Sequence, residues 1–309
     1  MKALEFVDAA TDVRLVQTDR ERPAPGDGEL LIRVRAAGII PTERLWYPTL
    51  CTQDGVPRRQ VIPAHEFAGE VVEDAGGSRG FKPGDLIFGM NGWFKDGALA
   101  EYTLAVPGSL AKIPPGISLE QAASVPISAL TAWQGLYERA NVRAGERVLV
   151  LGAAGAVGLY AVQLAAIRGA KVVATLSAQD FAVVEALGAS QLIDYRSQRF
   201  EELAGPVDVI FDTVGGDSLE RSWSLLKPGG RVITIASSSG SSTDPRTREA
   251  FLLVKPISSQ LSEMAGWLHA GRLKAFVKSV VPFSEAKSVF SGTEIPGSRR
   301  LGKIVVTTT

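Results

Sequence analysis

The sequence predicts an α/β fold that joins a β-rich part to a doubly wound parallel sheet. From about residue 146 to residue 235, short apolar runs alternate with helical stretches. Such alternation is typical of a parallel sheet covered by helices on both faces. The first third of the chain instead alternates strands and turns, and the tail follows the order strand–helix–strand. A chain of 309 residues is long enough for about two domains.

The composition argues against several classes of partner and location. Lys+Arg and Asp+Glu balance at 33 each, so the chain lacks the basic surplus that favours nucleic acid or anionic membrane surfaces. Its one cysteine, Cys51, allows no intrachain disulfide, which fits a reducing cytoplasm. No apolar run approaches the roughly 18–20 residues that a spanning helix needs, and the N-terminus has no apolar core of the signal-peptide kind. We expect a cytoplasmic protein with no nucleic-acid or membrane partner.

Several segments in the first third have the pattern of strands that end in turns. LLIRVRAAGI, residues 30–39, alternates in the manner of a half-buried strand. The sequences SRGFKPGD and MNGWFKDGA are typical of turns. Beyond IPPG, Ser118 and Gln121 form the pattern of a capping box and predict the start of a helix. Further strands are expected at 65–76, 85–90 and 99–106.

The middle of the chain predicts a series of strand–helix units. A helix is expected directly after the first of these strands, and others at about 179–187 and 217–226. Right-handed crossover connections between such strands give a doubly wound sheet. The strands are expected at 147–152, 171–176, 191–195, 207–215 and 230–237.

The last third begins with a polar, serine-rich loop at 237–247. FLLVKP, residues 251–256, follows as a predicted short strand. A helix is expected over about 256–271, with Gly271 as its C-cap. The tail then predicts a strand at 274–283, a helix at 284–292 and a strand at 303–309.

The glycine turn VLGAAGAVG, residues 150–158, lies between a predicted strand and a predicted helix. In this context Gly155 lets backbone amides approach a pyrophosphate, and Gly158 lets the helix pack close to the strand. The helix N-terminus adds partial positive charge toward the anion. The alternative is a tight bend with no ligand. Because further strand–helix units follow, the pattern favours a dinucleotide site.

The end of the second strand favours NADPH over NADH. An acidic residue at this point would hold the ribose 2′-hydroxyl of NAD. The chain has Thr175–Ser177 there, and the next acidic residues lie inside the following helix. Ser177 can donate to a 2′-phosphate, and Tyr195 and Arg196 close the third strand nearby. The alternative for Arg196 is a solvated surface arginine.

The chain as a whole resembles the medium-chain dehydrogenase/reductase superfamily, in its zinc-independent quinone oxidoreductase and enone reductase branch. The resemblance implies a GroES-like catalytic domain formed by 1–117 and 272–309, and a Rossmann domain formed by 118–271. The motifs that carry it are VRAAGIIPTE, PAHEFAGEVVEDAG, FKPGDLIFGM, ASVPISALTAW, ERVLVLGAAGAVGLYAVQLA, LGASQLIDYR, VDVIFDTVGG, LLKPGGRVITI and LGKIVV.

The resemblance also implies which residues bind the cofactor. One departure concerns Gln179, where many relatives carry a lysine that grips the 2′-phosphate. Val214 is expected near the nicotinamide, with a place in the core as its alternative. The implied set is Thr131, Gly155, Ala156, Val157, Gly158, Ser177, Tyr195, Val214, Ala236, Ser237 and Lys303.

The residues at the zinc positions of the superfamily predict that this chain holds no zinc. Ile40 stands where zinc alcohol dehydrogenases carry a cysteine, and Pro126-Ile127 stands near their third ligand. The pair His65-Glu66 is kept. A catalytic zinc normally needs three protein ligands, so we expect a structural role for His65.

Without a zinc ion to polarise an alcohol or ketone, the chemistry favours quinones and alkenes conjugated to carbonyls as acceptors. Trp46 and Tyr47 are expected to line an apolar pocket beside Ile40. Trp93 is expected on the opposite wall, with a place in a surface turn as its alternative. Tyr47 is a candidate proton donor, and water is the alternative. Many quinone-reductase relatives carry an asparagine at Ile40, and some enoyl reductases carry a tyrosine where this chain has Pro41.

Two other functions stay open at this point. One is an enoyl-thioester reductase of fatty-acid or polyketide type, and the other is a catalytically silent NADPH-binding relative. A homodimer is expected, because relatives often pair the edge strand that corresponds to 251–256 across a two-fold axis. The alternative is an internal strand of a monomer.

Overall fold

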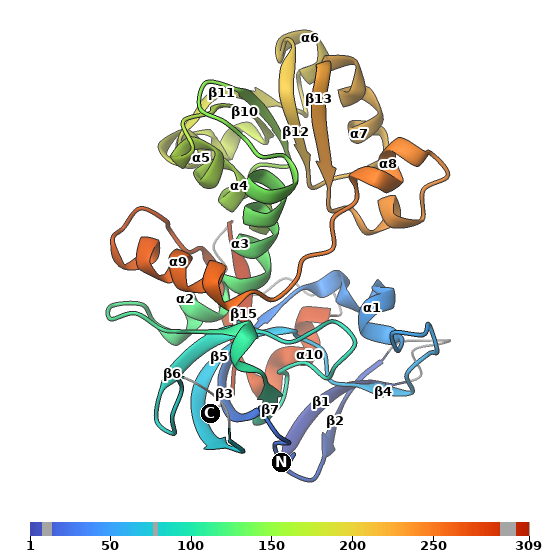
Figure 1. The fold of residues 1–309 in the computed structure, drawn as a ribbon. Coiled ribbons are helices and arrows are strands. Elements are labelled where there is room, and N and C mark those ends of the chain that lie inside the picture. Colours follow the sequence, from blue (N-terminus) through green and yellow to red (C-terminus); the bar gives the residue numbers. More distant parts are fainter. Residues whose placement is uncertain (8–13, 77–79, 291–300, 309) are drawn as a thin grey trace. The chain divides into compact units, whose positions relative to one another are not determined.

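The computed structural model describes the chain except residues 8–13, 77–79, 291–300 and 309. The chain forms two compact units, shown with their elements in Figure 1. Unit 1 comprises Met1–Ile127 and Lys255–Thr309, and unit 2 comprises Ser128–Val254. No helix in the described part of the chain is long and apolar enough to cross a membrane.

Unit 1 is built on a large, mainly antiparallel sheet. Its strand order is β14-β15-β3-β5-β6-β8, and β7 also pairs with β3. The C-terminal β15 pairs antiparallel with the N-terminal β3, so the tail completes the sheet begun by the first third of the chain. The strands are β3 (Leu30–Ile39), β5 (Glu66–Asp74), β6 (Leu86–Met90), β7 (Tyr102–Ala105), β8 (Leu110–Lys112), β14 (Val277–Pro282) and β15 (Lys303–Thr307).

A smaller sheet, with strand order β2-β1-β4, joins the same core. Phe6 of β1 and Phe67 of β5 are fully buried, and Phe6 meets Phe290 edge to face. Two helices of unit 1 pack on the large sheet, α2 against β3 and β5, and α9 against β8, while α10 contacts β2 of the smaller sheet. These elements are β1 (Lys2–Val7), β2 (Arg14–Asp19), β4 (Gln60–Val61), α1 (Tyr47–Leu50), α2 (Leu119–Ala123), α9 (Ser258–His269) and α10 (Ala286–Phe290).

Unit 2 is a parallel sheet with strand order β11-β10-β9-β12-β13. In chain order this is 3-2-1-4-5, so the doubly wound prediction is confirmed, with the switch point between β9 and β12. The strands are β9 (Arg147–Leu151), β10 (Lys171–Leu176), β11 (Ala189–Asp194), β12 (Val207–Asp212) and β13 (Leu226–Thr234). The helices are α3 (Pro126–Trp133), whose first two residues belong to unit 1, α4 (Ala156–Ile167), α5 (Phe181–Ala186), α6 (Phe200–Leu203), α7 (Gly216–Ser222) and α8 (Pro245–Ala250).

Two predicted helix ends are confirmed by their capping geometry. The Ser118 side chain accepts from the Gln121 amide, and the Gln121 side chain accepts from the Ser118 amide, which completes the capping box of α2. Gly271 has a φ of +69° just beyond α9, where a residue with a side chain would be strained.

The predicted strand at 251–256 is wrong for all but its first residue. Phe251 forms an isolated bridge with Thr234, and the Leu252 amide donates to the Thr234 carbonyl. The run then leaves the sheet, and Pro256 has no amide with which to continue a ladder. The serine-rich segment also contains helical turns, over Ser237–Ser241 and at the start of α8.

The boundaries of the two compact units lie at other residues than the domain boundaries predicted from the sequence. Residues 118–127 and 255–271 fall in unit 1, because α2 and α9 pack on its sheet. The resemblance implies that both segments belong to the Rossmann domain. The assignment of 1–117 with 272–309, and of 118–271, to two functional domains stays a prediction.

Candidate functional site

The glycine turn between β9 and α4 has the geometry of an anion cradle. Gly152 has a φ of +79°, and the Gly155 amide donates to its carbonyl over 3.0 Å. A Cβ at Gly158 would lie 2.2 Å from the Gly152 carbonyl oxygen, so only glycine allows this approach of helix to strand. Gly155 is exposed at the N-cap of α4 and brings no side chain over the first amides of the helix. Those amides, which include Ala156 and Val157, can therefore face a phosphate.

Two loops at the carboxyl ends of β10 and β11 meet beside this turn. The Tyr195 amide donates to the Leu176 carbonyl, which brings the end of β11 next to Ser177. Tyr195 is 56% exposed, and Arg196 is exposed with its guanidinium 5.8 Å from the Tyr195 ring. The structure thus places Ser177, Tyr195 and Arg196 together at one corner of unit 2. The exposed guanidinium remains accessible to an anion there.

The other predicted cofactor residues of unit 2 lie at the ends of β12 and β13. Val214 is 54% exposed after β12, so it is not a core residue. Ala236 and Ser237 follow β13, with Ala236 half-buried and Ser237 exposed. Thr131 lies in α3 and is 3% exposed.

Lys303 lies in unit 1 and forms a buried ion pair. Its Nζ is 2.5 Å from Glu66 Oε1, and both residues are at least 95% buried. Glu66 Oε2 accepts from the Ile127 amide over 2.9 Å, at the first turn of α3. The sequence predicts that Lys303 lies at the cofactor, whereas its carboxylate partner is seen only in the structure.

A second cluster in unit 1 joins Glu43, Thr49 and His65, all at most 1% exposed. Thr49 Oγ1 lies 3.3 Å from both Glu43 Oε1 and His65 Nε2, and His65 Nε2 lies 3.4 Å from Glu43 Oε1. The Ala64 amide donates to both Glu43 oxygens over 3.1 Å. Ala64 has a φ of +67°, so the carboxyl group holds a strained turn directly before His65.

Burial shifts both titratable groups of this cluster toward their neutral forms. It raises the pKa of Glu43 to about 8, against the opposing effect of its hydrogen bonds from Ala64 and Thr49. Burial also lowers the pKa of His65 to about 3, and the charge of Arg58 acts in the same direction. A neutral carboxyl group and a neutral imidazole therefore share this pocket near pH 7.

Trp46 and Trp93 lie side by side above this cluster. Their ring centroids are 5.5 Å apart in an edge-to-face arrangement, and the Trp93 ring is 5.1 Å from His65. Trp93 is 6% exposed, so the protein covers most of its ring. The expectation that Trp46 and Trp93 line opposite walls of a pocket stays a prediction. Ile40 is half-buried before the 3₁₀ turn Pro41–Leu45. The side chain of Tyr47 lies outside what the structure describes.

The donor set in this region does not fit a catalytic zinc. Ile40 offers no donor atom, and Glu66 is committed to Lys303 and to the Ile127 amide. His65 and Glu43 supply two donors, one fewer than such a site requires. Within the described ranges, no three His, Cys, Asp or Glu side chains group as a metal site would need.

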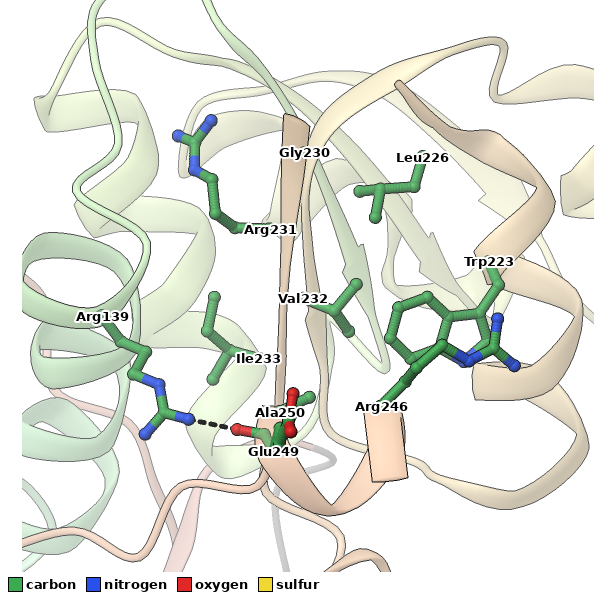
Figure 2. A pocket seen from close by; sticks show the side chains of 10 residues that line it. All are labelled: Arg139, Trp223, Leu226, Gly230, Arg231, Val232, Ile233, Arg246, Glu249 and Ala250. Atoms are coloured by element: carbon green, nitrogen blue, oxygen red, sulfur yellow. Dashed lines mark hydrogen bonds between the residues drawn. The ribbon is translucent and has the colours of Figure 1, made fainter. Parts of the chain in front are cut away.

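A separate cavity of about 390 Å³ lies along β13 in unit 2 and is shown in Figure 2. Its arginines are held by the protein itself. Arg231 pairs with Glu146, Arg246 pairs with Asp244, and Arg139 donates to the Glu249 carbonyl. None of the predicted cofactor or substrate residues lines this cavity.

Sequence reasoning missed two buried acids that organise these regions. Glu43 follows the apolar pair Ile39-Ile40 by three residues, and Asp212 ends the apolar run of β12. Both are at most 1% exposed. An acidic residue directly next to an apolar segment indicates a buried carboxyl group. Such a group must accept hydrogen bonds from nearby donors, so it organises the residues around it.

Family comparisons match the chain in two parts. The description "Alcohol dehydrogenase GroES-like domain" matches residues 26–115, and "Zinc-binding dehydrogenase" matches residues 187–306. A solved quinone oxidoreductase from Coxiella burnetii aligns with a TM-score of 0.84 at 28% identity, covering 100% of this chain and 99% of that one.

Three curated relatives match over nearly the whole chain. A 2-methylene-furan-3-one reductase of Solanum lycopersicum is 31% identical over 99% of this chain and 79% of its own. A chloroplastic quinone oxidoreductase of Triphysaria versicolor is 32% identical over 92% and 91%. A chloroplastic NADPH-dependent alkenal/one oxidoreductase of Arabidopsis thaliana is 32% identical over 99% and 79%. The chain therefore belongs to the medium-chain dehydrogenase/reductase superfamily of oxidoreductases, in its quinone oxidoreductase and enone reductase branch.

Proposed function

We propose that this protein is a zinc-independent, NADPH-dependent reductase of quinones or α,β-unsaturated carbonyl compounds. The observation that carries the proposal is the glycine turn at the N-terminus of α4, with its unscreened amides beside the switch point of the sheet. The names of the relatives support it, since they include quinone oxidoreductases and an NADPH-dependent alkenal/one oxidoreductase.

The cofactor residues divide by the part of the dinucleotide they would hold. The amides of Ala156 and Val157 bind the pyrophosphate, and Gly155 leaves them uncovered while its own amide donates to the Gly152 carbonyl. Gly158 lets α4 approach closely enough for them to do so. Arg196, with Ser177 and Tyr195, holds the 2′-phosphate by charge and hydrogen bonds. A bound NADPH supplies the reducing equivalent from its nicotinamide.

Near the nicotinamide, the backbone and side chains of Val214, Ala236 and Ser237 would orient the ring. Thr131, at 3% exposure, is proposed to approach it from α3. Lys303 is also proposed to lie near the cofactor, with its charge compensated by Glu66.

The side chains of unit 1 that could ligate a metal support a reduction that proceeds without zinc. Glu66 is bound to Lys303, and Ile40 cannot ligate, so a third ligand is lacking beside His65 and Glu43. With no Lewis acid, an acceptor must take the reducing equivalent unaided, which quinones and enones do.

Ile40, Trp46 and Trp93 are proposed to form the apolar surface against which a flat acceptor lies. Such a surface excludes water and orients the ring of a quinone or the plane of an enone. Tyr47 or a water molecule would then provide the proton. The enoyl-thioester alternative is not favoured, because three relatives matched along most of their own length carry quinone or enone names.

A homodimer and a cytoplasmic location complete the proposal. The run 251–256, expected as the edge strand of the dimer, forms only the bridge of Phe251 with Thr234, so the dimer is proposed from the resemblance alone. Light scattering at micromolar concentration tests the first, and a clear monomer would contradict it. Fractionation of the native cells tests the second.

The function is tested by following NADPH oxidation with 9,10-phenanthrenequinone and with an alkyl enone, in parallel with NADH. The proposal expects turnover of at least one acceptor, faster with NADPH than with NADH, and no zinc by elemental analysis. Turnover restricted to a crotonyl thioester would favour the enoyl-thioester reductase instead. Cofactor binding without turnover of any acceptor would favour a silent relative.

A further inference from the structure

Asp212, the last residue of β12, is fully buried and binds the loop that follows its own strand. Its Oδ1 accepts from the Val214 amide over 3.0 Å. Both carboxylate oxygens accept from the Gly215 amide, over 3.0 and 3.1 Å. The carboxylate thus fixes the backbone on either side of the exposed Val214 side chain.

The same carboxylate reaches the neighbouring loop through one hydroxyl group. Thr234, the last residue of β13, donates from Oγ1 to Asp212 Oδ2 over 2.6 Å. The Thr234 hydroxyl in turn accepts from the Ala236 amide over 3.2 Å and lies 3.3 Å from Ser239 Oγ. Asp212 therefore determines the path of two loops, one after β12 and one after β13.

Steric contacts leave these loops little freedom to move separately. Gly215 has a φ of +76°, and a Cβ there would lie 2.5 Å from the Ala236 Cβ. A Cβ at Gly152 of the glycine turn would lie 2.4 Å from Thr213 Oγ1, which donates to the Leu151 carbonyl over 2.8 Å. The loops after β9, β12 and β13 are thus in direct contact at the carboxyl edge of the sheet.

This edge is where a doubly wound sheet receives a dinucleotide, on either side of the switch point. The end of β10 is the adenosine side, so the ends of β12 and β13 are the nicotinamide side. Asp212 is covered by the loops it holds and does not reach the surface. Its effect on a ligand must therefore pass through Val214 and Ala236.

We propose that Asp212 is a positioning residue for the nicotinamide half of the cofactor, acting through the loops after β12 and β13. The inference rests on the proposed function, because it requires a dinucleotide at this edge. Its physical basis is that one buried carboxylate, through neutral amide and hydroxyl donors, holds both loops.

The test compares Asp212→Asn with Asp208→Asn, at the opposite end of the same strand. Asp208 accepts from the Arg147 amide and from Lys227 Nζ, over 2.8 and 2.9 Å, so the control also loses carboxylate hydrogen bonds. Calorimetry measures the Kd of NADPH, and of 2′,5′-ADP, which carries only the adenosine half. Steady-state kinetics with 9,10-phenanthrenequinone gives kcat and KM.

Asp212→Asn is expected to raise the Kd of NADPH about tenfold, because hydrogen bonds to the loops are lost, and to lower kcat. It should leave the Kd of 2′,5′-ADP within about twofold, since the adenosine corner keeps its own contacts. Asp208→Asn should leave both Kd values and kcat unchanged. Thr234→Val removes only the hydroxyl link and should shift the NADPH Kd in the same direction, which keeps the test available if Asp212→Asn does not fold.

Equal weakening of NADPH and 2′,5′-ADP by Asp212→Asn, or no weakening of either, would overturn the inference while leaving the proposed function standing. The same holds if Asp208→Asn reproduces the full effect. A wild-type protein that binds neither NADPH nor NADH would overturn the proposed function and the inference together.

Discussion

Glu43 and His65 meet in unit 1 at a place where water reaches neither side chain. Because an ion there would be poorly solvated, both groups are held neutral, and the Ala64 amide and Thr49 hydroxyl satisfy the carboxyl oxygens. Two residues that would be charged in water at some physiological pH thus stay uncharged beside Trp93. The Trp93 ring therefore has an uncharged neighbour in His65.

The raised pKa of Glu43 predicts how stability depends on pH. With a pKa of about 8 in the folded state and an ordinary value of 4.5, Glu43 binds a proton on folding between these values. Its contribution to the free energy of unfolding is therefore present at low pH and is lost as pH rises toward 8. The slope reaches about 1.4 kcal/mol per pH unit.

Glu43→Gln should remove this slope between pH 6.5 and 8, measured as the difference from wild type in urea unfolding. Below pH 6.5 the lowered pKa of His65 acts in the opposite sense, because the unfolded state then binds the extra proton. Between about pH 4.5 and 6.5, the contributions of Glu43 and His65 to the pH dependence of the unfolding free energy therefore cancel. Parallel curves for wild type and variant above pH 6.5 would contradict the neutral state of Glu43.

Arg196 should decide the preference between the two cofactors. Arg196→Gln is expected to weaken NADPH binding about tenfold, because a charge-assisted hydrogen bond to the 2′-phosphate is lost, and to leave NADH binding unchanged. Arg199→Gln is the matched control, since Arg199 is also exposed on the surface but pairs with Glu201 and Glu202. An equal loss for both cofactors would show that Arg196 does not contact the 2′-phosphate.

At the level of elements, the approach of α4 to β9 depends on the absence of one methyl group. Gly158→Ala places a Cβ 2.2 Å from the Gly152 carbonyl, and that oxygen belongs to backbone that cannot move aside easily. We expect a loss of about 1–3 kcal/mol in unfolding free energy, together with loss of NADPH binding.

Gly266→Ala, within α9, provides the comparison for this change. A Cβ at Gly266 meets nothing within 4 Å, so the same substitution should stabilise the helix by up to about 1 kcal/mol. Chemical unfolding and calorimetry measure both variants. Unchanged NADPH binding in Gly158→Ala would contradict the role of this turn.

The ion pair between Glu66 and Lys303 ties β5 and β15 to the first turn of α3. Lys303→Met alone leaves a buried carboxylate without its partner and should cost about 3–5 kcal/mol. Adding Glu66→Gln removes that charge while keeping an oxygen for the Ile127 amide, so the double variant should recover most of the loss. Urea unfolding of the four proteins closes the cycle, and a double variant no better than Lys303→Met would contradict the account.

Across the whole molecule, the sequence predicts those strands and helices whose positions follow from the local spacing of apolar residues. Each strand of unit 2 was found within a few residues of its expected position, because an apolar run followed by a helix carries its own signal. The strand predicted at 251–256 is not formed, because a strand needs a neighbouring strand to pair with. The local sequence of the run does not determine whether such a neighbour is present. Likewise α2 and α9 have helical patterns, but only tertiary contacts assign them to unit 1.

The candidate site divides in the same way. The glycine turn and the corner of Ser177 and Arg196 could be predicted, because they follow directly from strand ends. The pairing of Glu66 with Lys303 could not be predicted, because the two residues are far apart in the chain. The sequence around each of them gives no sign of a buried ion pair. The network around Asp212 also depends on how β12 and β13 pair, which no single segment encodes.

The central claim is that a dinucleotide binds at the glycine turn and reduces its acceptor without zinc. The most direct measurement is NADPH-dependent reduction of 9,10-phenanthrenequinone by chelator-treated protein whose zinc content has been measured by elemental analysis. The account predicts undiminished turnover with far less than one zinc per chain. Stoichiometric zinc in the untreated protein, with turnover lost on its removal and restored on its return, would contradict it.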